Sequence, residues 1–125
     1  MRHLLLDSRR PSEWRQVLDR EAPRGDAEAR LGRGIAAFYL GLGARAREEL
    51  DEVRRLLLGS KHSGGLGAAY LWLARVEVLE GRSGRATRLL DQARQIAEKD
   101  GNAEQRLLEA AVGAEMALAA CEADC

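Results

Sequence analysis

The sequence is poor in several kinds of residue, and each scarcity narrows what the chain can be. Only 4% of its 125 residues are aromatic, and it has two cysteines and two prolines. No apolar run approaches the roughly 18–20 residues that a membrane-spanning helix needs. The start, MRHLLLDSRRP, also falls short of the roughly 7–15 apolar residues at the centre of a secretion signal. We therefore expect no membrane span and a protein that stays in the cytoplasm.

An excess of charge of one sign is also lacking, because 20 basic and 20 acidic side chains cancel. The two signs are interspersed: residues 1–60 carry 12 Arg and 10 Asp or Glu, and residues 61–125 carry 8 basic and 10 acidic residues. Neither half is a basic block of the kind that gains affinity from counterion release on nucleic acid. We therefore expect no nucleic-acid partner.

Residues in catalytic or cofactor-binding patterns are equally scarce. No serine, cysteine or histidine stands in a recognisable nucleophile arrangement. Residues 41–46, GLGARA, match a dinucleotide-binding pattern, but that pattern works only after a strand, and here a helix is expected before it. The carboxylate clusters, at residues 48–52 and at Glu77 with Glu80, are interpreted as solvated ion pairs on helix surfaces. The sequence thus predicts no enzyme and no cofactor.

The two cysteines, Cys121 and Cys125, are four residues apart and would share one face of a helix. A zinc site also needs further ligands, and His62 is expected on the order of 25 Å from Cys121 at about 1.5 Å of rise per residue. His3 belongs to the opposite end of the chain. Reduced thiols are the favoured interpretation, and no metal site is predicted; an intermolecular disulfide or a metal shared between chains stays open.

What the chain does contain is a helical pattern that stops at glycine and resumes. Ala86, Leu90, Ala93 and Ala97 recur at i, i+4, i+7 and i+11, which predicts an amphipathic helix. A second helical pattern precedes it and ends at Gly81, as a C-terminal glycine cap would end a helix. The stretch 73–101 is therefore predicted to be two antiparallel helices joined by residues 81–84.

The same unit occurs once before. The second helices match at an offset of forty, where Ala46, Leu50, Val53 and Leu57 precede Ala86, Leu90, Ala93 and Ala97. The first helices match best at thirty-eight, an alignment that places Gly43 opposite Gly81. A period of 30–40 residues built from helix pairs is typical of an α-solenoid.

The ends of the chain complete the expected architecture. A short helix begins at Pro11 and ends before Pro23, and this helix can cap the N-terminal end of the array. Asn102 is a plausible N-cap for a long helix at the back. We therefore expect one all-α domain, 1–125, of about six helices: a capping helix at 11–22, repeats at 26–58 and 63–99, and a partial third repeat or capping helix at 102–123.

Residues 35–43, Ile-Ala-x-Phe-Tyr-x-x-x-Gly, resemble the first helix of a tetratricopeptide repeat (TPR), in which a large apolar residue, a small one, an aromatic and a turn glycine follow in that spacing. Leu73-Ala74 through Gly81, followed by Ala86, Leu90 and Ala93, resembles the same repeat. The resemblance covers about residues 26–123. Glu77 departs from it, because it stands where the family usually has an aromatic residue. The resemblance implies a right-handed superhelix of helical hairpins.

The resemblance also implies a function, since TPR arrays hold a segment of a partner protein in the concave groove lined by their first helices. Transferring groove positions to this chain gives the predicted partner-binding residues Arg30, Arg33, Leu71, Trp72 and Arg75. Three arginines beside an apolar floor would suit an acidic or amphipathic segment. The alternative that these arginines pair with neighbouring glutamates, or stay solvated, remains open.

Two other functions fit the same pattern. The last helix lacks a mate and would bury Met116 and Leu118 against a second copy, which would make the chain a self-association element. The period of about forty residues and the composition are also similar to the sensor regions of large bacterial transcription activators of the maltose-regulator type. In that case the chain would be a sensing fragment of a larger regulator.

Overall fold

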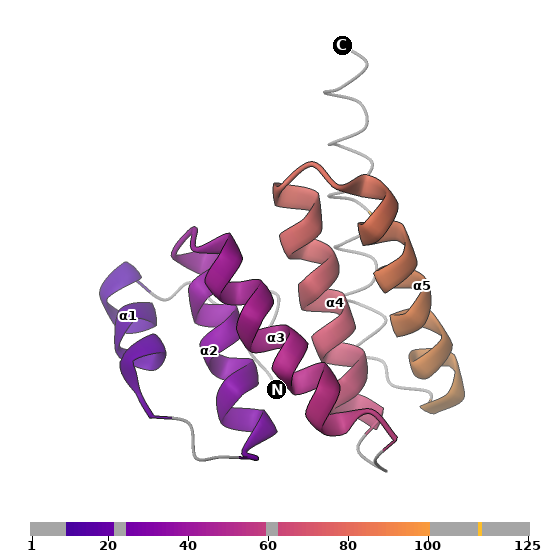
Figure 1. Cartoon of the computed structure of the whole chain (residues 1–125), viewed down its shortest axis with the longest axis horizontal. Helices are drawn as coiled ribbons and strands as arrows, with labels where there is room; N and C mark the ends of the chain where they lie inside the picture. The colour runs from indigo at the N-terminus through magenta and orange to yellow at the C-terminus, as the bar shows by residue number, and fades with distance from the viewer. Residues whose placement is uncertain (1–9, 22–24, 60–62, 101–112, 114–125) are drawn as a thin grey trace.

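The computed structural model describes residues 10–21, 25–59, 63–100 and 113, and the fold there is entirely helical (Figure 1). The all-α prediction is confirmed, with no strand among these residues. None of the described helices is both long and apolar enough to cross a bilayer. The predicted helix at 102–123, both cysteines and both histidines lie outside the described residues. The helices are α1 (Pro11–Asp19), α2 (Ala27–Tyr39), α3 (Gly43–Leu57), α4 (Ser63–Leu79) and α5 (Ser83–Asp100).

Each helix packs against the next one in the chain, and α2 also touches α4. Short turns join α2 to α3 and α4 to α5, so that each pair forms an antiparallel hairpin (Figure 1). In the view of Figure 1, α3 crosses in front, between its neighbours α2 and α4, with which it is in contact. Helix α1 packs on α2 at one end of the row, and α5 packs on α4 at the other.

Local sequence accounts for where the first helices begin. Pro11 is the first residue of α1, where its fixed φ suits a helix and its missing N–H is not needed. Asp26 is the N-cap of α2, and its Oδ1 accepts a hydrogen bond of 3.0 Å from the backbone N–H of Ala29. Helix α1 ends at Asp19, three residues before the predicted limit.

The turns that close α2 and α4 have the same hydrogen bonds. At the first turn, the N–H of Gly41 donates to the carbonyl of Phe38 (3.0 Å), and the N–H of Leu42 donates to Ala37 (2.8 Å). At the second, the corresponding bonds run from Gly81 to Val78 (3.1 Å) and from Arg82 to Glu77 (2.8 Å). Both glycines have φ +76°, the left-handed conformation that favours glycine after a helix.

These bonds correct the predicted alignment of the first helices. Every donor and acceptor of the first turn lies forty residues before its counterpart in the second, so Gly41 rather than Gly43 corresponds to Gly81. The expected offset of thirty-eight is therefore wrong. The sequence offered two glycines within three residues, and only the backbone shows that Gly41 has the positive φ while Gly43 begins α3.

The core is built by all five helices. It is one continuous cluster, in which α4 supplies the largest share of the side chains and α5 contributes Leu90 and Ala93. Burying one large aliphatic side chain of this kind contributes about 1.5–3 kcal/mol to folding. Representative core residues, each at most 4% exposed, are Trp14, Leu18, Leu31, Ile35, Leu50, Val53, Leu71, Trp72, Val76, Leu90 and Ala93.

Candidate partner-binding surface

The five residues predicted to bind a partner fall into two places. Arg30 and Arg33 lie on α2 and reach toward α3, whereas Leu71, Trp72 and Arg75 lie on α4. The side chains of Leu71 and Trp72 are both 0% exposed, inside the core. A partner docked on the surface of this chain would therefore not touch them. In a binding site they would support the exposed side chains that pack on them.

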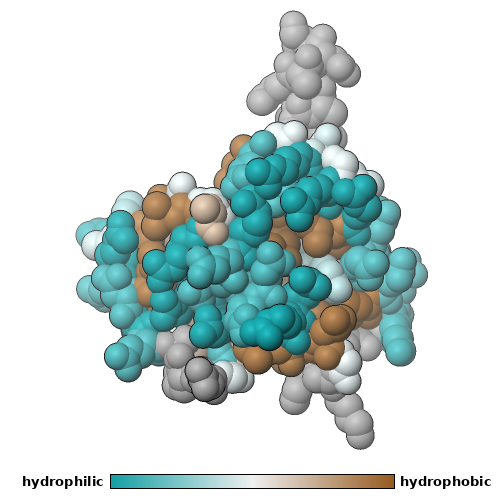
Figure 2. Space-filling view, in the orientation of Figure 1, coloured by the Kyte–Doolittle hydropathy of each residue, from teal (hydrophilic) through white to brown (hydrophobic). Residues whose placement is uncertain are grey.

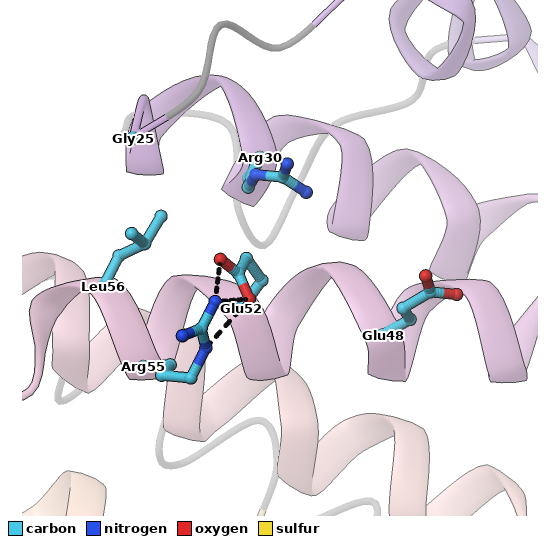
Figure 3. Close-up of a pocket in the computed structure, with 6 residues that line it drawn as sticks. All are labelled: Gly25, Arg30, Glu48, Glu52, Arg55 and Leu56. Carbon is cyan, nitrogen blue, oxygen red and sulfur yellow. Dashed lines mark hydrogen bonds and ion pairs between the residues drawn. The ribbon is translucent and has the colours of Figure 1, made fainter.

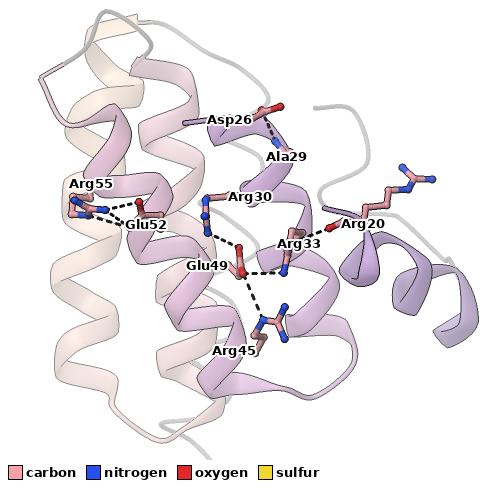
Figure 4. A network of polar contacts seen from close by, with 9 residues as sticks. All are labelled: Arg20, Asp26, Ala29, Arg30, Arg33, Arg45, Glu49, Glu52 and Arg55. Carbon is pink, nitrogen blue, oxygen red and sulfur yellow. Dashed lines mark hydrogen bonds and ion pairs between the residues drawn. The ribbon is translucent and has the colours of Figure 1, made fainter. Parts of the chain in front are cut away.

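Arg30 and Arg33 share one carboxylate with a third arginine (Figure 4). Glu49 of α3 pairs with Arg30 (Nη1 to Oε2, 3.4 Å), with Arg33 (Nη2 to Oε1, 3.4 Å) and with Arg45 (Nε to Oε1, 3.5 Å). Glu49 is only 5% exposed. The interpretation of this carboxylate as a solvated ion pair is therefore wrong: the approach of α2 to α3 covers it. We call these four residues the Glu49 cluster.

The Glu49 cluster has more donors than acceptors. Three guanidinium groups carry fifteen N–H bonds, whereas one carboxylate offers about four acceptor positions. Arg33 Nη1 also donates to the carbonyl of Arg20 (2.9 Å), which anchors it to the residue after α1. The Nε atoms of Arg30 and Arg33 are buried and have no hydrogen-bond partner. The cluster therefore has a formal charge of +2 and more donors than its one carboxylate can accept.

Beside this cluster lies an open hollow of about 560 Å³ (Figure 3). Arg30 projects into it from α2, and Glu48, Glu52 and Arg55 line it from α3, with Gly25 and Leu56. Arg55 is already occupied, because its Nη2 donates to both oxygens of Glu52 at 2.5 and 2.6 Å. These hydrogen bonds lower the pKa of Glu52 below its ordinary value. The hollow therefore has a wall of mixed charge beside the guanidinium of Arg30.

The face of the molecule around the hollow is also mainly polar. Figure 2 shows hydrophilic side chains gathered over the middle of the face that α3 presents to the viewer, with hydrophobic residues toward its edges. Within the part of the chain that the structure describes, no group of His, Cys, Asp and Glu side chains is placed to hold a metal ion. What this face can do chemically is form ion pairs and hydrogen bonds with a charged partner.

Arg75 lies in a different setting from Arg30 and Arg33. Its guanidinium carbon is 4.5 Å from the centre of the Trp72 ring and 4.7 Å from that of Phe38, with Tyr39 at 5.9 Å. Stacking of a cation on an aromatic face contributes about 0.5–2 kcal/mol and fixes the plane of the guanidinium. Trp14 stacks on Tyr39 with centroids 4.8 Å apart, which extends the ring cluster to α1. The structure thus brings Trp72 and Arg75 together, and Arg30 and Arg33 together.

A second buried carboxylate, Glu77 of α4, is 1% exposed and was also interpreted as solvated. Arg47 of α3 donates to it from Nε at 2.9 Å, Arg82 from Nη1 at 3.4 Å, and Arg85 Nε lies at 3.9 Å. Arg47 also donates to Glu80, which Arg82 approaches at 3.5 Å. Hydrogen bonds to Glu77 and Glu80 raise the pKa of Arg47 above its ordinary value. These five residues are the Glu77 cluster.

Sequence reasoning missed both clusters as units, although two signals pointed to them. Glu77 departs from the aromatic residue expected at its position, and Arg45 recurs as Arg85 forty residues later. An unexpected carboxylate together with a repeated arginine suggests a buried ion pair. Neither signal shows which face of α3 or α4 packs against the neighbouring helices, and the burial of Glu49 and Glu77 depends on that packing.

Comparison with known proteins adds no relative. The chain matches no protein-family model, no curated protein and no solved structure. The resemblance to the TPR family therefore stays a prediction, and the function has to be argued from the geometry of the chain itself.

Proposed function

We propose that this chain is a non-catalytic protein-interaction module of the cytoplasm, a short TPR-like α-solenoid that binds an acidic or amphipathic segment of another protein. The solenoid is supported by the two hairpins, whose closing turns have the same hydrogen bonds forty residues apart. Successive packing of each helix on the next also agrees with a repeating array.

The observation that carries the proposed binding is the imbalance of the Glu49 cluster. Its arginines come from two helices and converge on one carboxylate, so they are already arranged to hold carboxylate oxygens. The side chains of Arg30 and Arg45 are 30% and 42% exposed and can reach a partner, whereas Arg33 is more enclosed. Arginine pairs with carboxylates in two-pronged geometry, and such charge-assisted bonds are about twice as strong as neutral ones. A partner carboxylate is the group that best complements this surface.

Arg75 extends the same proposal toward α4. Trp72 is too deep to contact a partner, but its ring and that of Phe38 hold the guanidinium flat. Stacking fixes the plane of this guanidinium, which in this proposal faces a further acidic residue of the partner. In this account Arg30, Arg45 and Arg75 contact the partner, and Arg33, Leu71 and Trp72 position them.

The test compares the wild type with the double variant Arg30→Gln/Arg45→Gln and a matched control, Arg15→Gln/Arg54→Gln. The control removes the same charge from an exposed arginine of α1 and from an arginine of α3 that pairs with Asp51, neither of which lines the hollow. Each protein is used to capture partners from a lysate of the source cell, and the affinity of any purified partner is then measured by titration calorimetry. Circular dichroism checks that all three proteins are equally helical.

We expect the wild type and the control to retain the same partner, and the Arg30→Gln/Arg45→Gln variant to bind it at least tenfold more weakly, since charged hydrogen bonds contribute about 1.5–3 kcal/mol. Equal affinity for all three proteins would remove the Glu49 cluster from the interface.

A second candidate, self-association, is favoured by exposed leucines. Leu79 is 67% exposed at the end of α4, and Leu42 is 36% exposed in the first turn. Their chain neighbours lie close together, because a Cβ on Gly43 would lie 2.5 Å from a carboxylate oxygen of Glu80. Leu42 and Leu79 therefore lie at the same end of the molecule. A mass that rises with concentration in light scattering, and that Leu79→Gln returns to the monomer value, would favour this function over the first.

A further inference from the structure

The outer face of α5 carries a row of polar residues with one sign of charge. Arg85, Arg88, Gln92, Gln95 and Lys99 follow each other at i, i+3, i+7, i+10 and i+14, a spacing that keeps them on one face of a helix. All five are exposed, while the buried residues of α5 face the core on the other side. The row extends over about 21 Å, at about 1.5 Å of rise per residue. We call it the α5 row.

Acidic side chains are kept off this row. At about 100° per residue, Asp91 and Glu98 lie roughly 80–100° around the helix from its centre. Asp91 is paired there with Arg94, 3.6 Å away. The three cations of the row therefore have no carboxylate of their own helix facing them along the described side chains of α5.

The cations of the row are also hardly neutralised by other helices. Arg88 and Lys99 make no hydrogen bond or ion pair with a described residue. Arg85 is 3.9 Å from Glu77, at the outer limit of an ion pair, and its side chain is 58% exposed. Arg88 and Lys99, which are exposed and have no partner among the described residues, can therefore pair with an anion from outside.

The corresponding face of α3 shows that the fold does not demand such a row. Forty residues earlier, Arg45, Glu48, Glu52 and Arg55 occupy the first four positions, so the same face of α3 has no net charge. The flank differs too, because Glu49 stands where α5 has Leu89. The α5 row is therefore a property of this one helix and not of the repeat.

We infer that the α5 row is a docking surface for an acidic helix of another protein. Arg85 and Arg88, one turn apart, and Lys99, about three turns further along the same face, complement carboxylates on one face of a partner helix. Gln92 and Gln95, between Arg88 and Lys99, can both donate and accept hydrogen bonds. Leu89 and Ile96, both half-buried, border the row and offer an apolar edge to the partner helix. Single-stranded nucleic acid is the poorer fit, since the row has no aromatic side chain on which bases stack.

This site is separate from the Glu49 cluster, which allows a clean test. The probe is a fluorescent helical peptide of about 18 residues with glutamate at every third or fourth position and alanine and leucine elsewhere. Its binding is followed by anisotropy at about 50 mM salt, where screening is weak. The proteins are the wild type, Arg88→Gln/Lys99→Gln, the control Arg54→Gln/Arg55→Gln, and Arg30→Gln/Arg45→Gln.

We expect Arg88→Gln/Lys99→Gln to bind the peptide about fivefold more weakly than the wild type, from two exposed ion pairs at about 0.5 kcal/mol each, and the control Arg54→Gln/Arg55→Gln to change less than twofold. A charge swap sharpens the result: Arg88→Glu/Lys99→Glu should bind the corresponding lysine peptide, which the wild type should not.

Wild-type affinity in Arg88→Gln/Lys99→Gln, or a loss confined to Arg30→Gln/Arg45→Gln, would overturn the inference. The latter result would assign the peptide to the Glu49 cluster. Equally tight binding of an anionic DNA duplex through Arg88 and Lys99 would also overturn it, because the row would then bind polyanions in general.

Discussion

The Glu49 and Glu77 clusters share the same kind of ion pairing but differ in which helices they join. In both, a buried glutamate is met by three arginines. The partners of Glu49 come from α2 and α3, which form one hairpin, and all lie at 3.4–3.5 Å. The partners of Glu77 come from α3, from the turn after α4 and from α5, and the nearest is at 2.9 Å.

This difference teaches which cluster holds the molecule together. Glu77 links the first hairpin to the second through Arg47, so its loss would loosen the contact between the two hairpins. Glu49 links two helices that a short turn already joins, and its arginines are partly open to solvent. We therefore assign cohesion to the Glu77 cluster, and the proposed function assigns partner binding to the Glu49 cluster.

The largest expected effect on stability tests the different roles of Glu77 and Glu49 directly. Glu77→Gln should lower the free energy of unfolding by about 3 kcal/mol, because removing one partner of a buried ion pair leaves the others uncompensated. Glu49→Gln should cost only about 1 kcal/mol, since its longer bonds are replaced in part by water. Urea titration measures both, and equal losses would refute the division of roles.

The next effect compares two glycines. A Cβ at Gly34 of α2 would lie 2.7 Å from Cγ and Cδ2 of buried Leu50, whereas a Cβ at Gly84 of α5 would meet nothing within 4 Å. Gly34→Ala should therefore destabilise by about 1–2 kcal/mol through overpacking. Gly84→Ala should stabilise by about 0.5 kcal/mol through helix propensity. Thermal melts should move in opposite directions, and a stabilised Gly34→Ala would show that α2 and α3 are less closely packed than described.

A smaller effect tests whether the two turns are equivalent. Gly41 and Gly81 share φ +76° and open space around the missing Cβ. Each glycine-to-alanine change should cost about 1 kcal/mol, because an L side chain is strained in the left-handed conformation. Chemical denaturation should give values that agree within about 0.5 kcal/mol. A clear inequality would mean that the turns are not the same structural element.

The smallest effect concerns the exposed pair of Glu52 and Arg55. Removing it by Glu52→Gln should leave the denaturation midpoint unchanged at neutral pH, because exposed ion pairs contribute little. The pKa of Glu52 is lowered by Arg55, so any stabilisation is present above the unfolded-state pKa and disappears as the pH falls through the folded-state pKa. Midpoints of wild type and variant should therefore coincide in acid; a gap that widens there would mean that Glu52 has another partner.

Periodicity and glycine placement were enough to predict the five described helices and the two hairpins, because those signals are local. Burial was not predictable in the same way. Misplacing the turn glycine by two residues shifts the first-helix register by about 200° around the axis. Leu71 and Trp72, predicted to line the groove, lie in the core, because the sequence pattern alone does not show which faces of α4 its neighbours cover. Glu49 and Glu77 were interpreted as solvated because only the packing of neighbouring helices shows that they are covered.

The most direct measurement of the central claim is a nuclear magnetic resonance titration that follows the Nε–H signals of the arginines. The acidic segment of a partner retained by the wild type is added to the labelled protein. We predict that the signals of Arg30, Arg33 and Arg45 shift, while those of Arg47 and Arg82 stay in place. Shifts confined to Arg47 and Arg82 would contradict the account, because the cluster assigned to cohesion would then be the one that binds.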